Sequence, residues 1–371
     1  MEVPARLVSA SNAIYMLPTH LRAALRQVDD IPLSREQDNS QWWTALEKDL
    51  RRAHTKRFVD DVWTRFLARD PEITASLSAV TSVISISDKV LPPRALGRSA
   101  GSEYVSGLAM VRPAGHHSTS DRQAPLCAIN SVMVAALREA HAKGKPVGVL
   151  DIDVHFATGS QQIAMQWNER KAKEAGRVIV ADVYAAMGPP ARFVERVQRE
   201  HGDLQSRGLD EATLRAEMDA EFASAKPHER EVVSMVCDSH LLFPHDKAEL
   251  TDEALLEAST RSVEHFVRHG VEAVFVSLGL DAAAGDREGA QVRPGGFGNV
   301  VRMLRQSSMR SGFGLVLALE GGYHVGDLDV ADVLSGGEEV VVDEHADRYL
   351  GSGNFGKCVK AVALALVRDP T

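Results

Sequence analysis

The stretch Val147 to Gln161, VGVLDIDVHFATGSQ, places ionisable side chains at alternate positions of an apolar run. Its aliphatic residues predict a buried β-strand, where an unpartnered charge is costly. Asp153 and His155 are two residues apart, so on a strand they point the same way, about 6.6 Å apart along the chain. Both can reach one metal ion through bonds of about 2 Å. Asp151 falls on the same face, where it could support these ligands or hold a monovalent cation.

Three more polar clusters follow apolar runs of the strand type. They are RPAGHHS after 104–112, GLDAAAGD after 271–280 and EGGYH after 314–320. The carboxyl ends of parallel strands lie at one edge of a sheet, where ligands bind. Asp281 is therefore the candidate third ligand, although LDAAAGD could also simply open a helix. Two aspartates, one histidine and an open position describe a catalytic zinc site rather than a structural one.

The adjacent histidines His116 and His117 lie behind the turn-forming sequence RPAG. Beside a zinc-bound water, one imidazole can act as general base and then as general acid. A buried carboxylate such as Asp151 would orient the other ring. Other histidines, His141 and His265 among them, lie in polar helical patterns, and we expect them at the surface.

Tyr323 follows Glu320 and two glycines at the end of the last apolar run. The glycines allow the backbone to approach a ligand closely. The tyrosine hydroxyl could donate to a carbonyl oxygen as negative charge develops there. A packing role for Tyr323 is an equally good interpretation of that residue alone.

Apolar runs of strand type alternate with helical patterns from residue 104 onward. The strand candidates are YVSGLAMVRP, VGVLDIDVH, RVIVADVY, EVVSMVC, VEAVFVSLGLD and FGLVLALEGG, and the helix candidates are INSVMVAALREAHAKG, TDEALLEASTRSVEHFVRHG and GFGNVVRMLRQSS. This alternation predicts an α/β fold: a single domain over 1–371 with a central, mostly parallel sheet and helices on both faces. The motif-bearing core spans 104–335, and the polar, helix-prone residues 188–230 predict a helical excursion from it. The segments SQWWTALEKDLRRAHTKRFVDDVWTRFLARDPEI and ITASLSAVTSVISISDKVL predict further helices before the core.

The composition limits the location and the partners. Of 371 residues, 44% are apolar and 25% charged, as in soluble globular proteins. The net charge of −9 argues against direct nucleic-acid binding. Cys127, Cys237 and Cys358 form no CxxC pair, which favours a reducing compartment. With no signal-peptide pattern and no membrane-spanning run, we expect a protein of the nucleus, the cytoplasm or both, without membrane contact.

In this order, the motifs resemble those of the zinc-dependent histone deacetylase family, which includes acetylpolyamine amidohydrolases and shares its fold with arginases. VRPAGHH is similar to Arg-Pro-Pro-Gly-His-His, PLCAIN to Gly-Phe-Cys-x-x-Asn, and LDIDVH to Asp-x-Asp-x-His. LGLDAAAGD is similar to Gly-x-Asp-x-x-x-Gly-Asp, and LEGGYH to Glu-Gly-Gly-Tyr. The long segment after the LDIDVH motif suggests a divergent eukaryotic member, near the fungal Hos3-type enzymes.

The resemblance implies a role for each site residue. The zinc ligands, one ion per chain, would be Asp153, His155 and Asp281. His117 would be the base that activates water and the acid that protonates the departing amine, while His116, oriented by Asp151, would give electrostatic support. Tyr323 would polarise the acetyl carbonyl. The substrate-binding positions would be Pro125, Leu126 and Gly322.

The resemblance also implies the reaction and the partners. The family hydrolyses the acetyl-lysine amide of histones or other proteins, releasing acetate, and this links it to chromatin regulation and corepressor-type partners. It binds potassium as a structural ion beside the zinc strand, with Asp151, Asp153 and the His155 carbonyl as candidate contacts. Asp182 stands where the family usually has serine.

Two departures from the family pattern concern the site. Phe156-Ala157-Thr158 replaces His-Gly-Asp, so Thr158 would be a weaker, uncharged partner for the second histidine. Pro125-Leu126 replaces Gly-Phe, which removes an aromatic wall of the tunnel but leaves the Pro125 carbonyl as an acceptor. Both suggest altered rate or specificity with the metal ligands intact.

Three other functions stay open. A small-amide or acetylpolyamine deacetylase would use the same site. The arginase branch needs a second metal and an acid at the position of Ala157, which argues for one metal here. A weakly catalytic scaffold that binds acyl-lysine is the third, motivated by Thr158 and Leu126.

Overall fold

The computed structural model describes residues 5–15, 17–22, 25, 40–91, 106–171, 175–186, 188, 235–236, 239–324 and 354–367. Within them, a seven-stranded sheet has the order β1-β7-β6-β2-β3-β5-β4. Its strands are β1 (Ser106–Ala109), β2 (Val147–Asp151), β3 (Val178–Tyr184), β4 (Met235–Val236), β5 (His240–Pro244), β6 (Ala273–Leu278) and β7 (Gly314–Leu319). All pairings are parallel except that of β4, which runs antiparallel to β5 at the sheet edge. The predicted α/β class with a mostly parallel sheet is confirmed.

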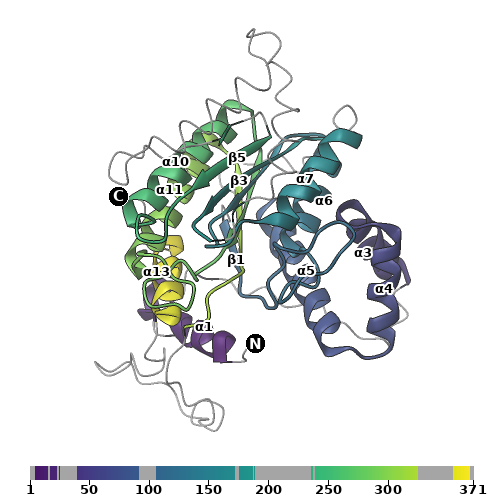
Figure 1. Ribbon diagram of the computed structural model, residues 1–371, viewed down its shortest axis with the longest axis horizontal. Helices are drawn as coiled ribbons and strands as arrows, with labels where there is room; N and C mark the ends of the chain where they lie inside the picture. Colours follow the sequence, from purple (N-terminus) through teal and green to yellow (C-terminus); the bar gives the residue numbers. More distant parts are fainter. Residues whose placement is uncertain are drawn as a thin grey trace.

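Helices cover both faces of the sheet (Figure 1). One face carries α3 (Ser40–Ala53), α4 (Lys56–Leu67), α5 (Pro71–Val90), α6 (Ser131–Lys143) and α7 (Thr158–Lys171). The other carries α1 (Ala5–Tyr15), α10 (Asp252–Arg268), α11 (Pro294–Ser311) and α13 (Phe355–Val367), and the short α2 (Thr19–Arg22) lies against α13. None of the helices in the described part of the chain combines the length and apolar character that crossing a bilayer requires.

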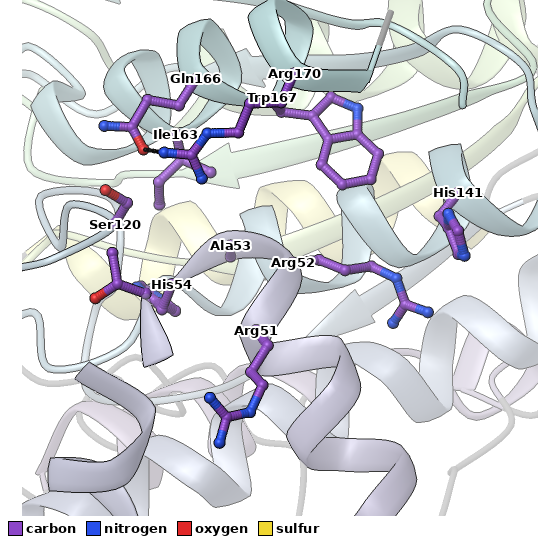
Figure 2. A pocket seen from close by; sticks show the side chains of 11 residues that line it. Arg51, Arg52, Ala53, His54, Ser120, His141, Ile163, Gln166, Trp167 and Arg170 are labelled. Atoms are coloured by element: carbon purple, nitrogen blue, oxygen red, sulfur yellow. Dashed lines mark hydrogen bonds between the residues drawn. The ribbon is translucent and has the colours of Figure 1, made fainter. Parts of the chain in front are cut away.

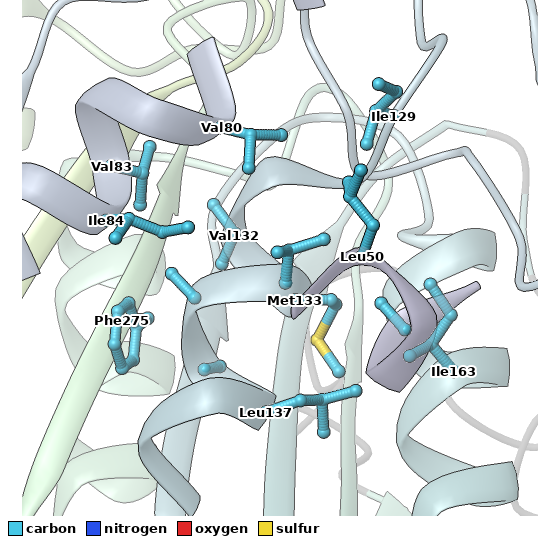
Figure 3. Packing of buried hydrophobic residues seen from close by; sticks show 14 of the residues in the cluster. Leu50, Val80, Val83, Ile84, Ile129, Val132, Met133, Leu137, Ile163 and Phe275 are labelled. Carbon is cyan, nitrogen blue, oxygen red and sulfur yellow. The ribbon is translucent and has the colours of Figure 1, made fainter. Parts of the chain in front are cut away.

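The central strands divide their side chains between two hydrophobic cores. In β2, Val149 belongs to the core under α5 and α6, whereas Leu150 belongs to the core under α10 and α11. The alternation follows from the two-residue period of a strand, and because both faces are covered, every residue of β2 is buried. Figure 3 shows the first core, in which Val132, Met133 and Leu137 of α6 pack beside Phe275 of β6.

Local sequence explains where the helices begin and end. Asp70 caps the N-terminus of α5 by accepting from the amides of Glu72 and Ile73, and Pro71 occupies the first turn. Pro71 thus begins α5 shortly after α4 ends at Leu67. Gly144, at φ +60°, ends α6 in the left-handed conformation that glycine adopts most easily.

The sequence analysis missed the helices α1, α2, α7 and α13 and the strand β5. The strand β5 is only five residues long, and its apolar centre LLF was too short to be recognised. The helix α7 has little apolar periodicity in TGSQQIAMQWNERK, because it packs through a few residues such as Ile163 and Trp167. The predicted excursion 188–230 and most of the run EVVSMVC lie outside the described residues.

A glycine of β2 makes room for the helix that covers it. A Cβ at Gly148 would lie 2.8 Å from the ring of Phe266, which is fully buried on α10. The neighbouring Val267 is on the outer side of the same helix and is 40% exposed. Substitutions at Phe266 and Val267 therefore separate the effect of core packing on stability from the effect of helix propensity.

We expect Phe266→Ala to lower the free energy of unfolding by about 3–5 kcal/mol, since it leaves a cavity against β2. Val267→Ala should change it by no more than about 0.5 kcal/mol. Urea unfolding followed by circular dichroism measures both. Equal losses in the two variants would contradict this packing.

Candidate active site

The predicted site residues follow three neighbouring strands. In the order β7-β6-β2, the loop after β2 carries Asp153 and His155, the loop after β6 carries Asp281, and the loop after β7 carries Tyr323. Parallel strands bring these loops to one edge. The two aspartates are 1% exposed and the side chain of His155 is 18% exposed, so two of the three predicted ligands are buried and the third is partly open to solvent.

Asp153, His155 and Asp281 come together as one cluster, with one ligand atom from each residue within 4.8 Å of the others. His155 Nδ1 lies 3.0 Å from Asp153 Oδ1 and 3.2 Å from Asp281 Oδ2. Two carboxylates and an imidazole at this separation can surround one small divalent ion. Among the described residues, these three form the group of His, Cys, Asp and Glu side chains whose ligand atoms lie close enough together to hold one metal ion.

The electrostatics of the cluster fit a cation. Asp281 Oδ2 is buried, and the ring nitrogen His155 Nδ1 lies 3.2 Å from it. Burial and the charge of Asp153 raise the pKa of Asp281 to about 7. Burial opposes the charged form of His155, but hydrogen bonds to Asp153 and Asp281 outweigh it and raise its pKa to about 10. Positive charge between the two carboxylates would therefore stabilise their ionised forms, and a divalent metal ion would supply it.

Glycines allow the loops to approach this closely. A Cβ at Gly321 would collide with the carboxylates of Asp153 and Asp281, and one at Gly279 would collide with Asp153. The amide of Gly321 donates to Asp153 Oδ2 at 2.9 Å. Gly322 has φ +109°, a conformation that side chains other than glycine rarely adopt. The Gly-Gly pair therefore makes the cradle in which the carboxylates lie.

The histidine pair lies beside the cluster. His116 Nδ1 donates to Asp151 Oδ2 at 3.2 Å, and its Nε2 is 3.7 Å from Asp153 Oδ1. The rings of His116 and His117 are 4.0 Å apart, and that of His117 meets the ring of His155 edge-on at 5.8 Å. The structure thus brings the histidines of RPAGHHS next to the carboxylates and the histidine of LDIDVH.

The two imidazoles differ in charge. Burial opposes protonation of His116, but the charges of Asp153 and Asp151 outweigh it and hold its pKa well above the ordinary value. Burial and the neighbouring charge of His116 lower the pKa of His117 to about 3. The surroundings therefore favour the charged form of His116 and the neutral form of His117.

Thr158 does not have the place expected of it. Its hydroxyl donates to the carbonyl oxygen of Phe156 at 3.4 Å, at the start of α7. The expectation that Thr158 is a weaker partner of His117 is therefore not met in the geometry. The reason is local, because a residue in the first turn of a helix bonds most easily to the backbone beside it. His117 is instead oriented by its ring contacts.

The turn that carries the predicted substrate-binding residues lies next to the histidines. The amides and carbonyls of Ala124 and Cys127 bond reciprocally at 3.0 Å around Pro125 and Leu126. Leu126 has φ +63° and is 38% exposed, which is rare for a large apolar residue. Cys127 bonds to the backbone of His117. Strain of this kind is typical of functional sites, so the geometry is compatible with a substrate contact at Leu126.

One histidine expected at the surface is buried. His265 is 5% exposed and stacks on His269 at 4.0 Å, whereas His141 is exposed as expected. The prediction for His265 was wrong because its position in α10 falls on the same side as Ser262 and Phe266, which face the core.

Glu320 is a functional candidate that sequence reasoning missed. Its Oε2 accepts from the amides of Gly115 at 2.6 Å and of His116 at 3.3 Å. Burial raises the pKa of Glu320 to about 7. Because Tyr323 is three residues further on, Glu320 fixes the histidine loop relative to the tyrosine loop. The available signal was an acid directly after an apolar strand, as in the LDIDVH motif.

Asp286 is a second such residue. Its Oδ2 accepts from the amides of Tyr323 at 2.8 Å and His324 at 2.9 Å. The aspartate itself is 9% exposed. It therefore sets the backbone that presents the Tyr323 side chain, and it is a positioning residue. Its place at the end of the GLDAAAGD motif was the signal in the sequence.

Comparison with known proteins identifies the family of this chain. A model of the family described as "Histone deacetylase domain" matches residues 15–332. This chain belongs to the histone deacetylase family. Histone deacetylase 5 of Arabidopsis thaliana is 27% identical over 285 residues, covering 75% of this chain and 35% of that protein. The acetylpolyamine amidohydrolase of Mycoplana ramosa is 27% identical over 268 residues, covering 71% and 62%.

The histone deacetylase fold is shared with a solved structure. The crystal structure of the HDA15 HD domain has a TM-score of 0.62 at 18% identity, covering 99% of this chain and 85% of that one. At this identity the likeness concerns the fold alone. This chain spans about a third of the length of histone deacetylases 5 and 18 of Arabidopsis thaliana, 35% in each case.

We expect His155→Ala to lose bound metal, because it removes the only nitrogen ligand of the cluster. His141→Ala, at an exposed histidine of α6 outside the cluster, should keep the wild-type metal content. Elemental analysis of the purified proteins, after loading with zinc and desalting, measures the stoichiometry. Full zinc occupancy in His155→Ala would remove it from the ligand set.

We expect Asp286→Ala to lower kcat by up to about 100-fold with metal content unchanged, because a shift of about 1 Å in the tyrosine loop misplaces its hydroxyl. Asp286→Asn keeps an oxygen that can accept the same amide bonds and should restore most of the rate. If Asp286 had a purely structural role, both variants would lower the thermal stability and leave kcat unchanged.

Proposed function

We propose that this chain is a zinc-dependent amidohydrolase that removes the acetyl group from lysine side chains of histones or other proteins. The observation that carries the proposal is the metal-binding geometry of Asp153, His155 and Asp281 directly beside the His116–His117 pair. Membership of the histone deacetylase family supports the reaction class. The products would be acetate and the free lysine amine.

Asp153, His155 and Asp281 would hold the zinc ion, which when bound polarises a carbonyl and lowers the pKa of water. His117, neutral with its pKa near 3, accepts the proton of the attacking water. A protonated imidazole of such low pKa is a strong acid, so His117 then protonates the amine as the amide bond breaks. His116 stays charged, held by Asp151 at 3.2 Å.

Tyr323 and the turn at Pro125 would bind the acetyl-lysine group. The Tyr323 hydroxyl donates to the acetyl oxygen as negative charge develops on it. The Pro125 carbonyl accepts from the substrate amide, Leu126 covers the alkyl chain, and Gly322 lets the backbone pass close to it. The positive φ and exposure of Leu126 support its contact with a ligand.

A potassium ion as a second, structural cation is part of the proposal. Asp151 and Asp182 are both fully buried and pair across β2 and β3. Burial and the charge of Asp151 raise the pKa of Asp182 well above its ordinary value. A monovalent cation beside Asp151, with Asp153 and the His155 carbonyl as further contacts, would relieve this repulsion.

An acetylpolyamine is the second candidate substrate. The alignment covers 62% of the Mycoplana ramosa amidohydrolase but 35% of the plant deacetylase. A net charge of −9 favours cationic substrates in general. Both substrates share the amide chemistry, so they are distinguished by kcat/KM and not by the site residues.

We expect the zinc-loaded chain to release acetate from an acetyl-lysine histone peptide with a higher kcat/KM than from N-acetylputrescine. Tyr323→Phe should lower turnover by about 10²–10³-fold, because it removes one donor to the developing oxyanion. Its zinc content should equal that of the wild type. Released acetate, measured by a coupled assay, gives the rates.

Two outcomes would contradict the proposal. Bound zinc without acetate release from either substrate, and without inhibition by hydroxamates, favours an acyl-lysine-binding scaffold. Preference for N-acetylputrescine favours the small-amide deacetylase.

A further inference from the structure

A cavity of about 180 Å³ lies on the α3–α7 side of the sheet. Its lining includes none of the proposed metal ligands nor the His116–His117 pair. Figure 2 shows Ile163, Gln166, Trp167 and Arg170 of α7 on one wall and the C-terminal end of α3 on the other. His141 lies at one end and Ser120 at the other. The space is several times the ~30 Å³ that a water occupies in the liquid, enough for a phosphate-sized group.

Three guanidinium groups line the cavity, and those of Arg51 and Arg52 also pair with acids that lie outside the lining. Arg51, Arg52 and Arg170 contribute guanidinium groups, His141 contributes an imidazole, and no Asp or Glu is among the lining residues. The chain as a whole carries a net charge of −9, so a basic cavity is contrary to its average surface. A basic hollow of this kind attracts anions.

The arginines keep donors for a ligand. Arg51 pairs with Glu47 and Asp60 through Nε and Nη2, leaving Nη1 outside these bonds. Arg52 pairs with Asp49 through Nη1. The bond of Arg170 within the described chain is to a neutral group, Gln166 Oε1, at 3.4 Å. Guanidinium groups carry five N–H donors each, so each arginine can also bind an oxyanion.

Neutral polar groups complete the cavity. Thr55 is the N-cap of α4, whose first turn has no acidic residue, so the positive end of the helix dipole adds to the potential. His54 is not a ligand: Nδ1 donates to the Thr119 carbonyl, Nε2 accepts from the Asn130 amide, and burial lowers its pKa to about 4. It forms a rigid, neutral floor.

We propose that this cavity is a binding site for a small, multiply charged oxyanion of the phosphate class. Arg170 on α7, which lies beside Gln166 in Figure 2, holds the oxygens, while Arg51 and Arg52 contribute guanidinium groups on the opposite wall. Ser120 and Gln166 provide polar contacts between them. The site is separate from the proposed metal centre and does not depend on the deacetylase reaction.

The test is calorimetric titration of the full chain with inorganic phosphate at low salt. Phosphate is also a ligand for zinc, so the titration is repeated on His155→Ala, where the metal site is removed and cavity binding should persist. Arg170→Gln should weaken binding about tenfold, the loss expected for one charge-assisted hydrogen bond. Arg310→Gln is the matched control, an exposed arginine of α11 whose Nε bonds to the carbonyl of Gln306.

A second variant tests the proposal even if Arg170→Gln does not fold. Gln166→Glu is isosteric, adds a helical pair with Arg170 and should leave thermal stability unchanged or higher. It should nevertheless weaken phosphate binding at least tenfold, because its carboxylate occupies the guanidinium and repels the anion. Equal affinities in wild type, Arg170→Gln and Arg310→Gln would overturn the proposal, as would binding that disappears only in His155→Ala.

Discussion

Buried negative charge at the carboxyl ends of β2, β6 and β7 is the constraint on which this structure depends. Asp151, Asp153, Asp281 and Glu320 are each at most 1% exposed, and they lie on adjacent strands. Such carboxylates are tolerated only with hydrogen bonds and positive charge close by. The amides of Gly115, His116 and Gly321 donate hydrogen bonds to these carboxylates. The ring of His116 brings positive charge close to them, and a metal ion between the ligands would bring more.

The helices that flank the sheet fix the reactive loops as well as the core. The amides of Gly159 and Ser160, in the first turn of α7, both donate to the carbonyl oxygen of His116, at 2.9 and 3.0 Å. A Cβ at Gly159 would collide with the backbone of Ser118, so glycine is needed for this approach. The N-terminus of α7 therefore holds the histidine loop, while its C-terminal half lines the basic cavity.

The sequence predicted the sheet and the membership of the site because both follow from local patterns. Continuous apolar strands and acids at their ends were enough to place Asp153, His155 and Asp281 at one edge. The strand β5 and the roles of Glu320 and Asp286 could not be predicted in this way. Glu320 and Asp286 act by accepting hydrogen bonds from backbone amides that are distant in sequence. The bond between Glu320 and Gly115, for example, joins residues 205 positions apart. Spacing carries no information on such bonds.

The position of Thr158 has a consequence for the proton-transfer residue. A carboxylate at this point would stabilise the imidazolium form of His117, but Thr158 bonds to the Phe156 backbone instead. His117 is then left with the charge of His116 at a ring distance of 4.0 Å, which opposes its protonation. Its strength as an acid rises and its strength as a base falls. In the proposed mechanism, the low pKa of His117 makes its attack-assisting role as a base the harder one, while its protonation of the departing amine becomes easier.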